Sequence, residues 1–109
     1  MIYLCNALSP FMLPKMMVGN EHHLKIRRIS AIEAGDILKG NAFRSFYGHP
    51  ESVKYLQKYL RLQIPVSRGF VQLDRDDILI IATIQSKRAW EQGRKPAPTW
   101  RFFKVEMTK

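Results

Sequence analysis

The residues best suited to chemistry in this 109-residue chain lie in the stretch Tyr47-Gly48-His49-Pro50-Glu51-Ser52. An apolar and aromatic run over residues 42–47 ends at Gly48, and Pro50 directly follows His49. Proline is favoured as the first residue of a helix because its missing N–H is not needed there. His49 is therefore predicted to lie where a strand passes into a helix. The free N–H groups of such a helix start attract anions, phosphates above all.

A second corner of the same design is expected near the start of the chain. Residues 2–6 favour a strand, and Ser9 followed by Pro10 is typical of an N-cap and a first helical residue. Asn6 would then lie at the end of the strand, as His49 does at the other corner. An ordinary structural role is open to each of these residues, because Asn6 and Ser9 can cap a turn and His49 can substitute for an N-cap.

Further polar candidates stand beside the expected strands. Arg68 precedes a short run over residues 70–73, while Arg88 and Glu91 follow the most apolar run, residues 78–84. In a wound sheet such residues gather in a crevice beyond the strand ends. The alternatives are a surface position for Arg68 and, for Arg88 and Glu91, a local ion pair worth under about 1 kcal/mol.

Several common chemistries have no motif in this sequence. His22 and His23 are adjacent, so they cannot easily share one metal ion, and neither Cys-x-x-Cys nor His-Glu-x-x-His occurs. A Gly-x-Ser-x-Gly nucleophile elbow, a Walker loop and a Gly-x-Gly-x-x-Gly fingerprint are also absent from the sequence. We therefore expect no metal and no cofactor.

The strongest compositional signal is charge. Eighteen Lys and Arg face nine Asp and Glu, which gives a formal net charge of +9. Such an excess favours an anionic partner, with nucleic acid or nucleotides first and a membrane surface second, although solubility or a basic source proteome would also account for it. A single cysteine, Cys5, fits a reducing cytoplasm. The first residues lack a positive leader and an Ala-x-Ala-like cleavage site, so we do not expect secretion, and the absence of an apolar run of about 18 residues predicts no membrane span.

Hydrophobic spacing and turn residues predict the elements that must position these groups. A capping box at Ser30-Ala31-Ile32-Glu33 opens a helix that ends at Gly40, and a second helix runs from Pro50 to about Leu60. Strands are predicted over residues 2–6, 24–29, 42–47, 70–73, 78–84 and 100–107, with a loop over residues 85–98. The fold class is α/β or α+β, a single domain over residues 1–109 with a mixed five- to six-stranded sheet flanked by helices.

Five motifs recur here in an order that is similar to one known family. They are Leu4-Cys5-Asn6-Ala7-Leu8-Ser9, Gly48-His49-Pro50-Glu51-Ser52, Arg68, Arg88-Ala89-Trp90-Glu91-Gln92-Gly93 and Phe102-Phe103-Lys104-Val105. Together they resemble the viral-type ring nucleases, anti-CRISPR proteins that degrade the cyclic tetra-adenylate second messenger of type III CRISPR systems. The resemblance implies a mixed sheet with flanking helices and a homodimer that holds one ring across its interface, in the cytoplasm of the host cell.

The resemblance also implies roles for particular residues. His49 matches the catalytic general acid, Arg88 the arginine beside the scissile phosphate, and Glu91 an acidic partner near it. The residues that match ligand-binding positions are Asn6, Ser9, Ser52, Arg68 and Gln85. Three positions depart from the family pattern: Cys5 replaces a common threonine, Glu51 replaces a small polar residue, and an extra residue or two in the loop separates Gln85 from the family's glutamine.

The expected function is therefore metal-independent cleavage of cyclic tetra-adenylate to linear di-adenylate with 2′,3′-cyclic phosphate ends, with neither a membrane nor a stable long nucleic acid as partner. One alternative is a non-catalytic basic module that binds nucleic acid or a cyclic nucleotide, since it would use the same charge and the same helix start. Another is a structural or interaction protein that shares only the fold.

Overall fold

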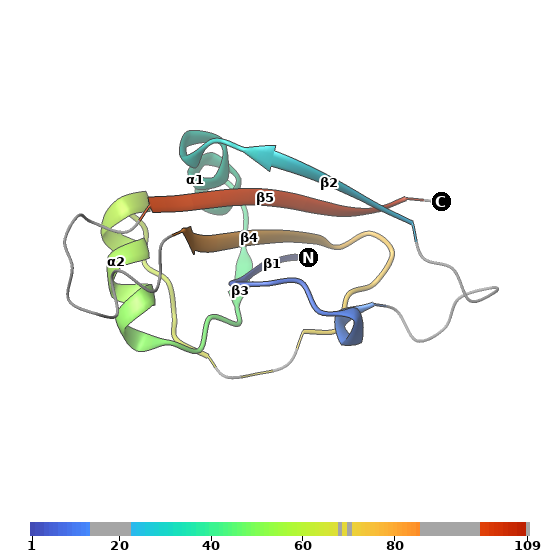
Figure 1. Cartoon of the computed structure of the whole chain (residues 1–109), viewed down its shortest axis with the longest axis horizontal. Helices are drawn as coiled ribbons and strands as arrows, with labels where there is room; N and C mark the ends of the chain where they lie inside the picture. The colour runs from blue at the N-terminus through green and yellow to red at the C-terminus, as the bar shows by residue number, and fades with distance from the viewer. Residues whose placement is uncertain (14–22, 68, 70, 86–98, 109) are drawn as a thin grey trace.

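The computed structural model describes residues 1–13, 23–67, 69, 71–85 and 99–108 (Figure 1). Within these residues, five strands form one sheet in the order β2-β5-β4-β1-β3. The strands are β1 (Ile2–Cys5), β2 (His23–Ile29), β3 (Phe43–Ser45), β4 (Ile78–Gln85) and β5 (Thr99–Thr108); the helices are α1 (Ala31–Lys39), α2 (Pro50–Leu60) and the 3₁₀ turn η1 (Pro10–Met12). The predicted small α+β domain with a mixed sheet is confirmed.

The direction of the strands decides where their ends meet. β1 is parallel to β3 and to β4, whereas β5 is antiparallel to β4 and to β2. In the register of the parallel strands, Leu4 lies between Ser45 and Ile80. The carboxyl ends of β1, β3 and β4 therefore meet at one edge of the sheet, where α2 begins.

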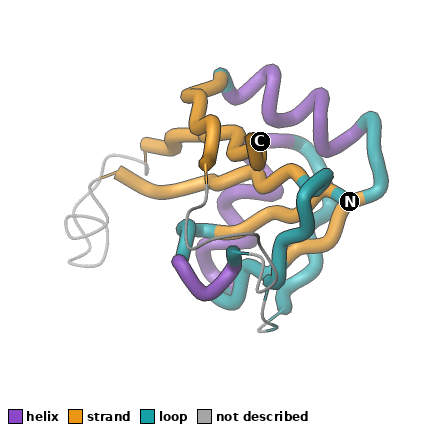
Figure 2. The backbone as a smooth tube through the Cα atoms, turned by 90° about the vertical axis from the view of Figure 1, so that its right-hand side faces the viewer, coloured by secondary structure: helices purple, strands orange, loops and turns teal. Residues whose placement is uncertain are grey.

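The sheet buries apolar side chains on both faces. On one face, Leu4, Ile80 and Phe102 pack with Leu38 of α1 and Leu56 of α2. The other face carries Cys5, Leu79, Ile81 and Val105, which are covered by Met12 of η1 and by Val71 and Leu73. Figure 2 shows the strands as one twisted layer with helices packed against it. β4 lies at the centre of the sheet and is covered on both faces, as its apolar sequence predicts.

The predicted helix starts are confirmed. The Ser30 hydroxyl accepts a 3.0 Å hydrogen bond from the backbone N–H of Glu33. The Glu33 carboxylate does not complete the capping box but pairs with Arg27 at 2.8 Å. His49 is the N-cap of α2 and Pro50 its first residue.

Two strand predictions are wrong in part. No strand forms over residues 71–73, because Leu73 donates its N–H to the carbonyl of Met12 at 2.7 Å and the Gln72 amide donates to the carbonyl of Leu13 at 2.5 Å. This segment pairs with the chain beside η1 instead of joining the sheet. The strand predicted over residues 42–47 is limited to β3, although Phe46 still donates to the carbonyl of Leu4 at 2.8 Å.

The connection after β4 begins one residue later than predicted. Gln85 was expected to open a loop over residues 85–98, but it is the last residue of β4. The remainder of that loop, residues 86–98, lies outside the described residues. In the part of the chain that the structure describes, no helix is long and apolar enough to cross a membrane.

Candidate functional site

A small cavity of about 90 Å³ lies where the parallel strands end and α2 begins. Its lining comes from three parts of the chain: Asn6, Tyr47, His49, Ser52, Thr83 and Ile84. Asn6 directly follows β1, and Thr83 and Ile84 belong to the last part of β4. Since β1 and β4 are parallel neighbours, their carboxyl ends bring these residues together, as in other sheets that bind ligands beyond their strand ends.

His49 lines the cavity, and its side chain does not cap α2 as the side chain of an N-cap residue usually does. Its backbone is extended, with φ −103° and ψ 105°, and its carbonyl accepts a 3.0 Å hydrogen bond from Val53. Its side chain makes no capping hydrogen bond and is exposed. The imidazole is therefore available to a ligand at the mouth of the cavity.

The start of α2 supplies hydrogen-bond donors at the same place. The first N–H groups of a helix have no partner inside it, and Pro50 has no N–H at all. The amides of Glu51 and Ser52 are thus the donors of the first turn. The Ser52 side chain lines the cavity and is only 6% exposed. The Glu51 side chain is exposed and does not line the cavity, so its carboxylate would act on a bound anion only through space and not by contact.

Tyr47 fixes the wall of the cavity. Its hydroxyl donates a 2.8 Å hydrogen bond to the carbonyl of Ala82 in β4, and the residue is 2% exposed. Burial, and secondly the nearby Cys5, raise the pKa of the Tyr47 hydroxyl above its ordinary value of 10.0. The hydroxyl therefore stays protonated and keeps its role as a donor.

The structure brings three of the predicted site residues together: Asn6, His49 and Ser52 line one cavity. Ser9 does not line it; its hydroxyl accepts from the N–H of Phe11 at 3.3 Å and so caps η1. Gln85 follows Ile84 as the end of β4, and only its backbone is described. Arg68, Arg88 and Glu91 lie outside the described residues.

Tyr47, Thr83 and Ile84 line the cavity but were not predicted as site residues. Thr83 is the one polar residue in the apolar run over residues 78–84, and that interruption is the signal that was available. Tyr47 gave no such signal, because an aromatic residue at the end of a strand is usual in a core. Among the described residues, no three His, Cys, Asp or Glu side chains lie close enough together to hold a metal ion.

Comparison with known proteins decides the family. The family model of the STIV B116-like proteins matches residues 2–94, which include every residue of the cavity. The chain belongs to the STIV B116-like family. The predicted membership of a viral protein family is supported by this match.

A solved structure agrees with the family assignment. The fold is similar to that of B116 of Sulfolobus turreted icosahedral virus (STIV), with a TM-score of 0.69, 17% sequence identity, and coverage of 96% of this chain and 97% of that chain. At this identity the likeness to B116 shows the fold alone. No curated protein matches the chain.

Proposed function

We propose that this STIV B116-like protein is a metal-independent ring nuclease. It would cleave cyclic tetra-adenylate to linear di-adenylates with 2′,3′-cyclic phosphate ends and thereby switch off type III CRISPR signalling. The observation that carries the proposal is the meeting of Asn6, His49 and Ser52 at the open start of α2. The sequence resemblance to viral-type ring nucleases supports it independently.

The reaction requires little from the protein, because ribose supplies its own nucleophile. The 2′-hydroxyl attacks the adjacent phosphorus and gives its proton to solvent, while the bond from phosphorus to the 5′-oxygen breaks. A protonated His49 donates a proton to the departing 5′-oxygen. General acid catalysis of this kind contributes about 10²–10⁴-fold.

The surroundings of His49 suit this role. The amides at the start of α2 would bind the phosphoryl oxygens, and the hydroxyl of Ser52 and the amide of Asn6 would orient the ribose and phosphate. By the resemblance, Arg88 stabilises the charge on the phosphate, Glu91 lies beside it, and Ser9, Arg68 and Gln85 hold other parts of the ring. Alignment of the three reacting atoms contributes as much as the proton.

The cavity fits one link of the ring and not the whole ring. Its volume of about 90 Å³ is well below the roughly 300–1,000 Å³ of pockets that enclose a small ligand, so it suits a single phosphate. A cyclic tetranucleotide would therefore lie over the mouth of the cavity. We propose that a second copy of the chain covers its other half, because a four-fold ring presents equivalent phosphates to the two sites of a two-fold dimer.

Incubation with cyclic tetra-adenylate in EDTA tests the proposal. We expect the wild type to release linear di-adenylate, and His49→Ala to lower the cleavage rate by about 100-fold or more while ring binding is retained. His23→Ala, at the start of β2 and outside the cavity, is the matched control and is expected to cleave at the wild-type rate.

The same experiment separates the second candidate function. A non-catalytic cyclic-nucleotide or nucleic-acid binding module would use the net charge of +9 and the same helix start. In that case the wild type would bind the ring saturably and leave it intact. Cleavage by His49→Ala at the wild-type rate would contradict the role of His49.

A further inference from the structure

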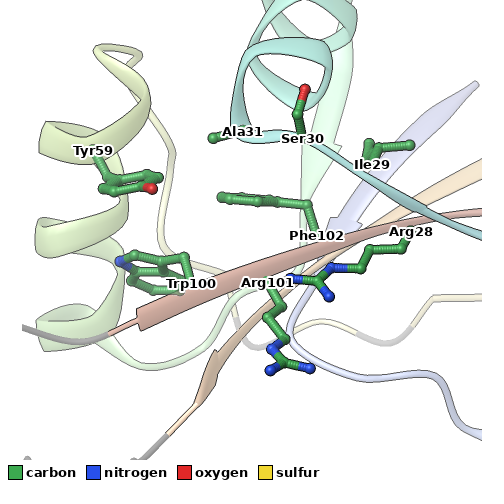
Figure 3. Close-up of a pocket in the computed structure, with 8 residues that line it drawn as sticks. All are labelled: Arg28, Ile29, Ser30, Ala31, Tyr59, Trp100, Arg101 and Phe102. Atoms are coloured by element: carbon green, nitrogen blue, oxygen red, sulfur yellow. The ribbon is translucent and has the colours of Figure 1, made fainter.

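We propose that the protein has a second ligand site, for a single nucleotide unit, in a cavity of about 360 Å³ at the edge of β5 (Figure 3). The lining residues come from β2, the start of α1, the last turn of α2 and β5: Arg28, Ile29, Ser30, Ala31, Tyr59, Trp100, Arg101 and Phe102. None of them lines the cavity that holds His49. The proposal therefore does not depend on ring cleavage.

The cavity exists because β2 is shorter than β5 at this end. β2 ends at Ile29, which pairs with Phe102, and α1 begins two residues later. Residues 99–101 of β5 therefore have no partner in β2. The open strand edge, the start of α1 and the ring of Tyr59 enclose the space.

Two arginine side chains line the cavity at this edge. Arg28 pairs in register with Phe103, so Arg101, two residues away on β5, is its diagonal neighbour on the same face of the sheet. Figure 3 shows both arginine side chains on the same side of β5. Two like charges on one face of the sheet attract an anion between them.

No described carboxylate neutralises this pair. Neighbouring cations do have such partners, since Arg27 pairs with Glu33 and Lys104 with Glu106. The Nε of Arg101 is buried and has no hydrogen-bond partner among the described residues. A buried donor without an acceptor is unusual and needs an explanation. A phosphate in the cavity would bind the other nitrogens of the two guanidinium groups in a forked, bidentate geometry, and it would meet this Nε once the Arg101 side chain turns toward the cavity.

The aromatic residues of the cavity indicate that its ligand carries a flat ring as well as an anionic group. Tyr59 stacks on Phe102 with ring centroids 6.1 Å apart and an angle of 20° between the planes, and Tyr59 is 53% exposed. Figure 3 shows Tyr59, Trp100 and Phe102 on the side of β5 away from the arginines. One face of the Tyr59 ring thus remains open beside the cavity. Aromatic side chains of this kind bind nucleobases by stacking, whatever the base.

A nucleotide combines the two features that the cavity offers. A nucleotide that lies across the open edge of β5 would place its phosphate beside the arginines on one face of the sheet and its flat base beside the exposed Tyr59 ring on the other. The volume of about 360 Å³ lies within the roughly 300–1,000 Å³ of small-ligand pockets. The nucleotide unit is either a free mononucleotide or the end of a single strand, and the chemistry recognised is the same.

Isothermal titration calorimetry with 5′-AMP, adenosine and inorganic phosphate tests this site. We expect saturable binding of 5′-AMP that is retained in His49→Ala, with adenosine and phosphate each about 10-fold weaker or more. Arg28→Gln and Arg101→Gln should each weaken 5′-AMP about 10-fold or more, because a hydrogen bond to a charged group is lost. Arg44→Gln is the matched control, since Arg44 is exposed on β3 at the opposite edge of the sheet and carries the same charge.

Further measurements show where 5′-AMP binds and whether the natural ligand is a free nucleotide or the end of a strand. Tyr59→Leu should weaken 5′-AMP, and His49→Ala should not. A linear tetra-adenylate that binds more tightly than 5′-AMP, with the same sensitivity to Arg28→Gln, identifies a strand end; equal or weaker binding identifies the free nucleotide. In the NMR spectrum of the wild type, the indole N–H of Trp100 should shift on addition of 5′-AMP, and Trp90→Phe assigns that signal.

Three results would overturn the proposal. The first is the absence of saturable 5′-AMP binding together with an unmoved Trp100 indole signal in the wild type, a measurement that needs no variant to fold. The second is an equal loss in Arg44→Gln and Arg28→Gln, which would indicate attraction to the overall charge. The third is phosphate binding as tightly as 5′-AMP, which would show that the base is not recognised.

Discussion

The hydroxyl of Tyr47 donates a 2.8 Å hydrogen bond to the carbonyl of Ala82, 35 residues further along the chain. Tyr47 lies two residues before His49, and Ala82 directly precedes Thr83 of the same cavity. The bond therefore joins the segment that leads into α2 to the last part of β4. Through it, the position of the proposed general acid depends on the central strand of the sheet.

Replacement of Tyr47 by phenylalanine should show this positioning role. Loss of the hydrogen bond should lower the free energy of unfolding by about 0.5–1.5 kcal/mol. If the proposed activity holds, kcat for ring cleavage should fall while KM changes little, because the proton donor loses alignment and the phosphate contacts remain. Tyr59→Phe, at an exposed position of α2, is the control for both measurements. Wild-type stability and kcat in Tyr47→Phe would show that the bond has no such role.

The charge of Glu51 should affect stability and anion binding in opposite directions. A carboxylate in the first turn of α2 interacts favourably with the helix dipole, so Glu51→Gln should destabilise the protein by about 0.3–1 kcal/mol. The same change removes a negative charge next to the cavity and should tighten binding of cyclic tetra-adenylate about two- to three-fold. Asp76→Asn makes the same charge change in the turn before β4, at the far end of that strand, and should leave ring binding unchanged. Thermal unfolding and titration calorimetry at low salt measure the two effects, and weaker ring binding by Glu51→Gln would contradict this account.

Stability should decline at alkaline pH because of Cys5. Burial raises the pKa of the Cys5 thiol from 9.0 to about 11. The unfolded chain therefore loses this proton first, so the stabilisation is complete below pH 9, falls as the pH rises, and is lost above about pH 11. The buried hydroxyl of Tyr47 acts in the same direction. Denaturant unfolding between pH 7 and pH 11 should show a smaller decline for Cys5→Ala than for the wild type, by about 1–2 kcal/mol. Parallel declines in the two proteins would exclude a contribution from this thiol.

The end of α2 offers a stabilising substitution. Arg61 adopts a left-handed conformation, with φ 54° and ψ 51°, and its N–H donates to the carbonyl of Gln57. A non-glycine residue in this region destabilises the folded state by about 1–2 kcal/mol. Glycine avoids this penalty but loses more conformational entropy on folding, so the net gain is smaller. Arg61→Gly should therefore raise the free energy of unfolding by about 0.5–1 kcal/mol. Arg61→Ala is the control: it removes the same side chain without relieving the backbone and should not stabilise the protein in a thermal melt.

Local sequence determined where both helices begin, which strand is central, and the part of the candidate site that lies at the start of α2. Pro50 after His49 and Ser30 before Glu33 specify where α2 and α1 begin, because these preferences depend only on near neighbours. The apolar run over residues 78–84 likewise identifies the central strand. For the same reason, His49 and Ser52 could be named together, since they share one helix start.

Only the tertiary structure decided what meets these residues. The parallel pairing of β1 with β4 brings Asn6 and Thr83 to the same cavity, and the bond from Tyr47 to Ala82 fixes its wall. The segment over residues 71–73 has the composition of a strand, yet it pairs with the chain beside η1, where its N–H groups find carbonyl acceptors. The position of Arg28 and Arg101 on one face of the sheet likewise follows from the register of β2 against β5. Such contacts join residues far apart in the sequence, and their free energy is gained only when the whole sheet has formed.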